Sequence, residues 1–553
     1  MRKVKNLQKV PFPAPDVVTK VIPAPTEGWD AISPLASMDP KRAPILINWV
    51  PRPGWVELRS GYKPWAWVGS DSPVNTLMVY RSATAEKLFA AAGSSIFNVS
   101  TLSQKDEVVS SLTSSKWQYI LFTPALGSTY LQCVNNSDSL RMYDGTSWTT
   151  PSITGLPGGL GTSAIVNIHS QKRRIWYALG DGSGGYSTIA AFMPTDAISG
   201  AIDGTLDLGA LWTKGGGLLA INNWTVDGGS GPQDYICFIS TRGQVSIFSG
   251  TDPTNAAAWS LVGTFDISPP ISERCTKRIG SDIAIITQQG VVPISQALPF
   301  DPSSDRSVSI TARIQNAMSA SSTSSNGNFG WQLTTYPNEQ LLILNIPNTE
   351  NSEQEQNVMN TITGAWTKFT GWNANCFEIF NNDLYFGGND GTVNWAYQGG
   401  LDLDQPITAE MQCAYNYFDD PGRTKRMTMV QPLFTSGGSV TPSIAVDEDF
   451  QTSSVSAPVQ LITGNVLWDV AEWDVDDWPA ETVSSKNWLS VQAIGHALAI
   501  HMKVNVTTHT DISQGEFDVS TFNSAQFDAT LDNATPILQI NAFNAIMELG
   551  GFI

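Results

Sequence analysis

The stretch NNDLYFGGNDGTVNWAY, residues 381–397, places two aromatic-rich apolar runs on either side of a glycine-rich turn. Asn389, Asp390 and Gly391 are residue types that tolerate the positive φ angles of tight hairpin turns. The flanking runs supply packing surface for two strands through Leu384, Tyr385, Phe386, Val393 and Trp395. The stretch therefore predicts a β-hairpin, in which the turn bends the chain and holds no ligand.

The same pattern recurs between about residues 75 and 400. Further hairpins are predicted at 87–100, 140–148, 173–192, 235–248, 283–295 and 336–347. The turns centre near residues 93, 145, 182, 243, 290, 338 and 391, so the mean interval, (391 − 93)/6, is about 50 residues. This spacing matches a four-stranded propeller blade, and apolar runs such as YICFI (235–239) suit strands buried on both faces. We predict a β-propeller of six or seven blades over 75–400, with a helix within 306–325.

The rest of the chain follows other patterns. Residues 1–35 contain six prolines and predict an extended arm that crosses a surface. Residues 487–506 alternate, with His496, Leu498 and Ile500 among the residues of one face, and predict one long strand with a buried side. We expect 401–553 to form a smaller β-sandwich or barrel-like platform domain, completed by the β segment 36–74. The predicted fold class is thus all-β.

Charge and cysteine usage limit the possible functions. The 553 residues carry 31 Lys and Arg against 50 Asp and Glu, a formal net charge of -19. Twenty of the acids and only five of the bases lie between residues 401 and 553. Such a chain repels a DNA backbone at long range. The five cysteines lie in strand-like runs and are expected to be buried and free, and no segment has the pattern of a cleaved signal peptide or a membrane span.

Several motifs suggest chemistry but lack the necessary partners. GDGSGG (180–185) fits GxGxxG, yet no helix long enough to hold a pyrophosphate follows. His496 and His501 differ in strand parity, which opposes a shared metal. YDGTSW (143–148) only approximates a sialidase Asp-box, and the acids of 445–450 and 469–478 leave calcium binding open. We assign no catalytic, cofactor-binding or metal-ligating residue, and no cofactor.

Three segments together resemble a known family. They are SMDPKRAPILINWVPRPGWVELRSGY (37–62), NTITGAWTKFTGWNANCFEIFNNDLYFGGNDGTVNWAY (360–397) and NWLSVQAIGHALAIHM (487–502). Their order is similar to that in the tail nozzle proteins of short-tailed bacteriophages, also called tail tubular or packaged-DNA stabilisation proteins. From the first segment to the last, the resemblance spans most of the chain.

The resemblance implies a structural virion protein and no enzyme. It implies six copies in a ring below the portal and adaptor, made in the host cytoplasm and placed in the virion tail. Its partners would be the adaptor, tail fibre or tail tip proteins, and genomic DNA that passes through the lumen without sequence-specific binding. No small-molecule substrate is expected. Two alternatives stay open: a propeller glycosidase or depolymerase of a tail adhesin, and a propeller that binds glycans without cleaving them.

Overall fold

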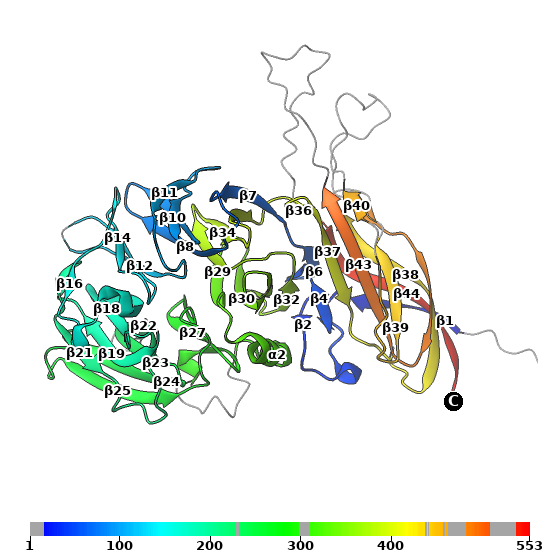
Figure 1. The fold of residues 1–553 in the computed structure, drawn as a ribbon. Coiled ribbons are helices and arrows are strands. Elements are labelled where there is room, and N and C mark those ends of the chain that lie inside the picture. The colour runs from blue at the N-terminus through cyan, green and yellow to red at the C-terminus, as the bar shows by residue number, and fades with distance from the viewer. Residues whose placement is uncertain are drawn as a thin grey trace, which may run out of the picture.

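The computed structural model describes residues 16–125, 127–227, 232–297, 309–436, 440, 442–456, 459–462, 483–508 and 538–552. Within these ranges the chain is built almost entirely of strands (Figure 1). None of the helices in these ranges is long and apolar enough to cross a membrane.

Seven blades of antiparallel strands make up a β-propeller in the described part of the chain. Blades one and two consist of β8 (Val74–Arg81), β9 (Glu86–Ala92), β10 (Ser95–Asn98) and β11 (Asp106–Val109), then β12 (Gln118–Phe122), β13 (Tyr130–Val134), β14 (Arg141–Tyr143) and β15 (Trp148–Thr149). Blades three and four consist of β17 (Ile165–Gln171), β18 (Arg174–Gly180), β19 (Tyr186–Phe192) and β21 (Gly204–Asp207), then β22 (Leu218–Asp227), β23 (Pro232–Ser240), β24 (Gln244–Gly250) and β25 (Trp259–Asp266).

The last three blades differ in how they are completed. Blade five has three strands, β26 (Thr276–Ile279), β27 (Asp282–Thr287) and β28 (Gly290–Pro293), and is followed by α1 (Ile294–Ala297) and α2 (Gln315–Ser325). Blade six consists of β29 (Gln332–Tyr336), β30 (Leu341–Thr349), β31 (Glu353–Asn360) and β32 (Trp366–Phe369). Blade seven consists of β33 (Cys376–Phe380), β34 (Asp383–Gly387), β35 (Thr392–Ala396) and β7 (Tyr62–Trp67).

The blades close into a ring, because each blade lies beside the next and β33 of blade seven lies beside β8 of blade one (Figure 1). The outer strand of blade seven, β7, comes from the N-terminal part of the chain and pairs antiparallel with β35. The predicted propeller is therefore confirmed, with seven blades. Each of the seven predicted hairpins lies in a different blade.

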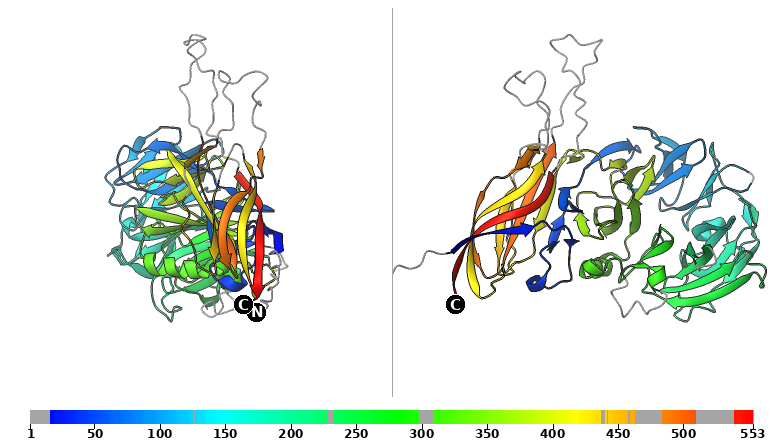
Figure 2. Two further views of the ribbon diagram at one scale, coloured as in Figure 1. Left: turned by 90° about the vertical axis from the view of Figure 1, so that its right-hand side faces the viewer. Right: turned by 180° about the vertical axis from the view of Figure 1, so that it is seen from behind.

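The second body is a β-sandwich. One sheet contains β1 (Asp16–Pro23), β5 (Trp49–Arg52), β6 (Trp55–Leu58), β38 (Arg423–Ser436), β41 (Val483–Ser485), β42 (Leu489–Gly495) and β44 (Leu538–Phe552). The other contains β4 (Ile45–Ile47), β37 (Gln405–Gln412), β39 (Ser443–Glu448), β40 (Val459–Ile462) and β43 (Leu498–Thr508). Side chains such as Met502 and Val504 of β43 share one core with Met427 and Phe543 of the opposite sheet. Figure 2 shows the two sheets face to face beside the propeller.

The sandwich and the propeller are joined by main-chain hydrogen bonds. β4 pairs with β37 on one side and, in parallel, with β32 of blade six on the other. The short strand β36 (Leu401–Asp402) pairs with both β37 and β7 of blade seven. β2 (Gly28–Trp29) adds a further parallel contact between β3 (Arg42–Ala43) and β32. Segment 36–74 thus supplies strands to both bodies.

Two expectations about local structure are wrong. The predicted single strand over 487–506 is two strands in opposite sheets, β42 and β43, because the chain crosses the sandwich at 496–497; Ile494 is 57% exposed while Leu498 is buried. In the turn of 387–391 only Gly391 has a positive φ, 77°, whereas Asn389 and Asp390 do not. A Cβ on Gly391 would lie 1.8 Å from the carbonyl oxygen of Ser70, so close backbone approach also requires glycine there.

The helix prediction is confirmed over a shorter range, since α2 begins at Gln315 and buries Met318. All five cysteines are buried and free, as expected. The predicted arm, 1–35, is described only from residue 16, where β1 pairs with β44. Residues 1–15, the acidic run 469–478 and His509 lie outside the described residues.

Candidate functional site

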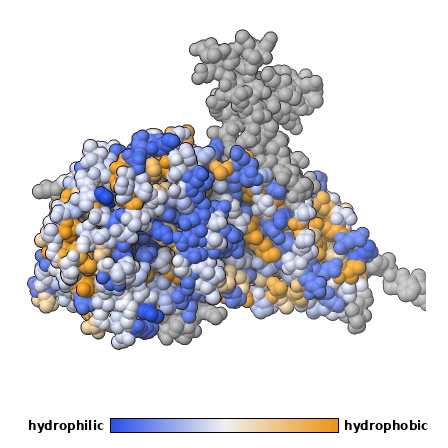
Figure 3. Space-filling view, in the orientation of Figure 1, coloured by the Kyte–Doolittle hydropathy of each residue, from blue (hydrophilic) through white to orange (hydrophobic). Residues whose placement is uncertain are grey.

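The innermost strands of the blades surround an axial channel with two contiguous cavities. The larger, of about 530 Å³, is lined mostly by loops that lead into innermost strands or connect neighbouring strands, and we call it the loop cavity. The smaller, of about 290 Å³, is lined mostly by the innermost strands themselves, and we call it the strand cavity. Gln118 and Glu273 line both. In the view of Figure 3 the surface around the middle of the molecule is largely hydrophilic.

Arg274 crosses the channel. It lies just before β26 in blade five, and its guanidinium donates hydrogen bonds to the carbonyl oxygen of Asn75 at 3.0 Å and to Thr76 Oγ1 at 2.6 Å, both in blade one. It also donates to the carbonyl oxygen of Trp117 at the start of blade two, at 3.0 Å. Burial lowers the pKa of Arg274, but an arginine keeps its charge at neutral pH. The Arg274 side chain thus joins blade five to blades one and two across the channel. It obstructs the channel through a single propeller.

Phe329, in the loop between α2 and β29, lies against this strut. The Arg274 guanidinium carbon is 4.6 Å and the Lys116 Nζ 4.7 Å from the Phe329 ring centroid, which are cation–π distances. Lys116 Nζ also lies 2.5 Å from Glu350 Oε1, while Glu350 Oε2 accepts a hydrogen bond from the Phe329 main-chain N–H. The loop that lines the cavity is therefore held from both its backbone and its ring.

Two carboxylates of the channel are each hydrogen-bonded to a phenol. Tyr186 OH donates to Glu273 Oε1 at 2.6 Å, and Tyr119 OH donates to Glu378 Oε2 at 2.7 Å. Burial, reinforced by the neighbouring carboxylate, raises the pKa of both phenols, so they stay protonated donors. These pairs connect different blades and form an ordered polar wall.

His169 lies on β17 and lines the strand cavity. Burial lowers the pKa of this imidazole to about 4, although the neighbouring Asn223 side chain opposes the shift. His169 is therefore neutral at pH 7, and its Nε2 has no hydrogen-bond partner in the described part of the chain. Within the same ranges no three His, Cys, Asp or Glu side chains converge so as to hold a metal ion.

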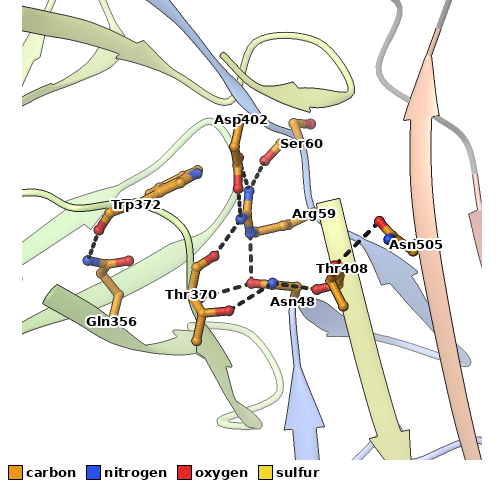
Figure 4. Close-up of polar contacts among 9 residues, drawn as sticks. All are labelled: Asn48, Arg59, Ser60, Gln356, Thr370, Trp372, Asp402, Thr408 and Asn505. Carbon is orange, nitrogen blue, oxygen red and sulfur yellow. Dashed lines mark hydrogen bonds and ion pairs between the residues drawn. The ribbon is translucent and has the colours of Figure 1, made fainter. Parts of the chain in front are cut away.

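A second polar cluster lies where the two bodies meet. Arg59, 1% exposed, binds both oxygens of Asp402, at 2.8 and 2.6 Å, and donates to Asn48 Oδ1 at 2.8 Å. It also donates to the carbonyl oxygen of Thr370 at 2.6 Å, and its guanidinium lies 5.2 Å from the Trp372 ring centroid. Figure 4 shows Arg59 between these partners, which come from blade six and from the strands of the junction. This network fixes the sandwich to the propeller.

A third cluster lies within the sandwich. His501 of β43 is 1% exposed, and its Nε2 lies 2.8 Å from Glu410 Oε1 of β37. Its Nδ1 lies 3.1 Å from Asp447 Oδ2 of β39, an ion-pair contact whose angle is unsuited to a hydrogen bond. Lys503 also contacts Glu410, at 3.1 Å. Burial alone would lower the pKa of His501, but the two carboxylates outweigh it and raise the pKa above its usual value.

The motifs noted in the sequence have structural roles in the described residues. In GDGSGG the Asp181 carboxylate accepts hydrogen bonds from the N–H groups of Ser183 and Gly185, and a strand follows. In 445–450, Asp447 faces His501 and Asp449 accepts from the N–H groups of His496 and Ala497. Arg59, Arg274 and Glu273 were not predicted from the sequence, because a charged residue in a loop beside a strand looks like an ordinary solvent-exposed residue when only one sequence is read.

Comparisons with known proteins do not identify the chain. Neither the protein-family models nor the curated proteins contain a match. Among solved structures, BBS1N in complex with ARL6DN is 10% identical, with 62% of this chain and 97% of that chain covered and a TM-score of 0.37. A 6-phosphogluconolactonase, so described provisionally, from Bacteroides uniformis is 13% identical, with 60% and 88% covered and a TM-score of 0.31. At these values neither likeness carries an argument about function.

Proposed function

We propose that this chain is a structural protein of a bacteriophage virion, six copies of which form the nozzle of a short tail. The ring lies below the portal and adaptor, retains the packaged genome and conducts it during ejection. This proposal assigns no catalytic residue and no cofactor.

The junction between the two bodies is the observation that carries the proposal. The three segments whose order resembles the nozzle family, 37–62, 360–397 and 487–502, are far apart in the sequence. In the fold they meet: β4 pairs with β32, β7 pairs with β35, and β43 joins β4 through β37. The resemblance therefore falls on one hydrogen-bonded connection between propeller and sandwich, reinforced by Arg59 and Asp402. A subunit in which the propeller and the sandwich are fixed to each other suits the wall of a DNA channel.

The channel of one propeller does not offer a path for DNA, because Arg274 and Phe329 obstruct it. In this proposal the genome passes between copies, through the hole of a ring made by head-to-tail contacts. A net charge of -19 favours such a conduit, since acidic walls leave the phosphates hydrated and unbound.

Electron microscopy of the purified protein, alone and with the adaptor complex, tests the proposal. We expect six-fold rings with a central hole, and the same protein in the tails of virions. A protein that stays monomeric at high concentration with adaptor present, and that is absent from virions, would rule the nozzle out. The competing glycosidase is tested separately by incubation with host polysaccharide and an assay for new reducing ends.

A further inference from the structure

The loop cavity carries polar groups that no neighbouring residue uses. Four of the residues that line it carry such groups: the side-chain amides of Gln118 and Asn326, the hydroxyl of Ser137 and Oδ1 of Asn136. None of these four groups has a hydrogen-bond partner among the residues that the structure describes; Asn136 uses only its Nδ2, which donates to the carbonyl oxygen of Gly184. They belong to blade two and to the loop before blade six. The lining of the cavity therefore includes hydrogen-bond donors and acceptors that no described residue uses.

The charged groups of this cavity are already compensated. Lys116 lies 2.5 Å from the Glu350 carboxylate, and Glu273 accepts the hydrogen bond of Tyr186 OH. An ionic ligand would have to compete with these contacts, whereas a neutral one would not. The cavity thus selects against anions and cations and favours an uncharged ligand with many hydroxyl groups.

Aromatic surface completes the lining. Tyr186 and Phe329 both border the cavity, and Phe329 is fixed by its contacts with Lys116 and Glu350. A sugar combines hydroxyl groups with apolar C–H faces. Its hydroxyl groups can hydrogen-bond to side-chain amides, and its C–H faces can pack on aromatic rings, whose bodies are apolar. The volume of about 530 Å³ is within the range typical of small-ligand sites.

We propose that the loop cavity is a binding site for a short neutral saccharide, with the Gln118 amide as a direct hydrogen-bonding group. This goes beyond the nozzle function and does not depend on it: a tail ring with such a site would carry a glycan-recognising surface on each subunit. No cleavage of the saccharide is involved.

The test uses the full-length protein and two kinds of probe. A glycan array of neutral and sialylated oligosaccharides identifies the ligand class, and saturation-transfer difference NMR with the selected saccharide measures its affinity. Ser137→Trp places a bulky indole at the lining of the cavity without removing a side-chain hydrogen bond, and Gln118→Leu removes the amide at nearly constant volume. Ser94→Trp, at an exposed serine in a hairpin turn of blade one, is the matched control.

We expect saturable binding of a neutral saccharide by the wild type and by Ser94→Trp, no binding by Ser137→Trp, and affinity reduced by about tenfold in Gln118→Leu. Unchanged circular dichroism and melting temperature show that each variant is folded, and ring formation by Ser137→Trp separates this site from the nozzle function. Binding to no saccharide, selective binding of sialylated ligands, or binding that Ser137→Trp leaves intact would overturn the proposal.

Discussion

Arg59 is a full charge held away from water, and its position makes it the most sensitive residue of the junction. Replacing Arg59 with Ala leaves the Asp402 side chain, 10% exposed, without its cation. Removing one partner of a buried ion pair typically costs about 3–5 kcal/mol. We expect Arg59→Ala to lower the free energy of unfolding in urea by that amount.

The matched control for Arg59 is Lys214, which pairs with Asp266 at 3.0 Å with side chains 46% and 49% exposed. Exposed pairs are worth about 0–1 kcal/mol, so Lys214→Ala is expected to change stability little. Equal losses in the two variants would show that the Arg59 network does not hold the junction.

His501 predicts a pH dependence of the sandwich. Because its folded-state pKa is raised above the unfolded value, the stability that it contributes is fully present below the unfolded pKa and is lost as the pH rises through the folded pKa. We expect the melting temperature to fall as the pH rises above the ordinary pKa of histidine, about 6.5, and His501→Gln to remove this part of the dependence. The groups facing the imidazole are Asp447, Glu410 and, beyond Glu410, Lys503.

His496 provides the control for this experiment, since its side chain is 40% exposed. His496→Gln should keep the alkaline loss of stability. The acidic side behaves in the opposite way: hydrogen bonds and His501 hold the pKa of Asp447 below its usual value despite burial, so its contribution is lost as the pH falls through that pKa. A wild-type curve that is flat above about pH 6 would contradict the assignment to His501.

At the scale of elements, the hairpin of β34 and β35 depends on one glycine. Gly391 combines a φ of 77° with a Cβ position 1.8 Å from a carbonyl oxygen, whereas Gly280 has a φ of 63° and open space around it. We expect Gly280→Ala to cost about 1 kcal/mol from backbone strain alone. Gly391→Ala should cost more than about 2 kcal/mol, because blade seven must also shift. Thermal melts of the two variants measure the difference, and equal melting temperatures would contradict it.

The hairpins were predictable because each joins two local strands by a turn of recognisable composition. Their uneven spacing has a structural cause: the predicted turn joins the second and third strands in most blades, but β14 to β15 in blade two and β29 to β30 in blade six. The break between β42 and β43 was not predicted because Ile494 has the same strand parity as Leu498 and Ile500, although the buried residues of β42, Val491 and Ala493, have the opposite parity. The channel residues were unpredictable, since they meet only when separate blades close into a ring.

For the whole molecule, the charge balance predicts behaviour towards DNA. A protein with a net charge of -19 gains nothing from releasing counterions of the phosphate backbone. We expect no retardation of duplex DNA in gels at low or at near-physiological salt, for monomers and rings alike. A retarded band that disappears as salt is raised would show a basic surface that the net charge hides, and would argue against an inert lumen.

The origin of β7 has a consequence for the life of the protein. Lys63 of β7 pairs with Trp395 of β35, a separation of 395 − 63 = 332 residues. On a ribosome the propeller cannot close until this second partner has emerged, although its first strand was made long before. Such a non-local step slows folding and leaves the edge of β7 without its neighbour in the meantime. A protease that removes residues 1–70, and with them β7, should therefore open the ring of blades even after the propeller has closed.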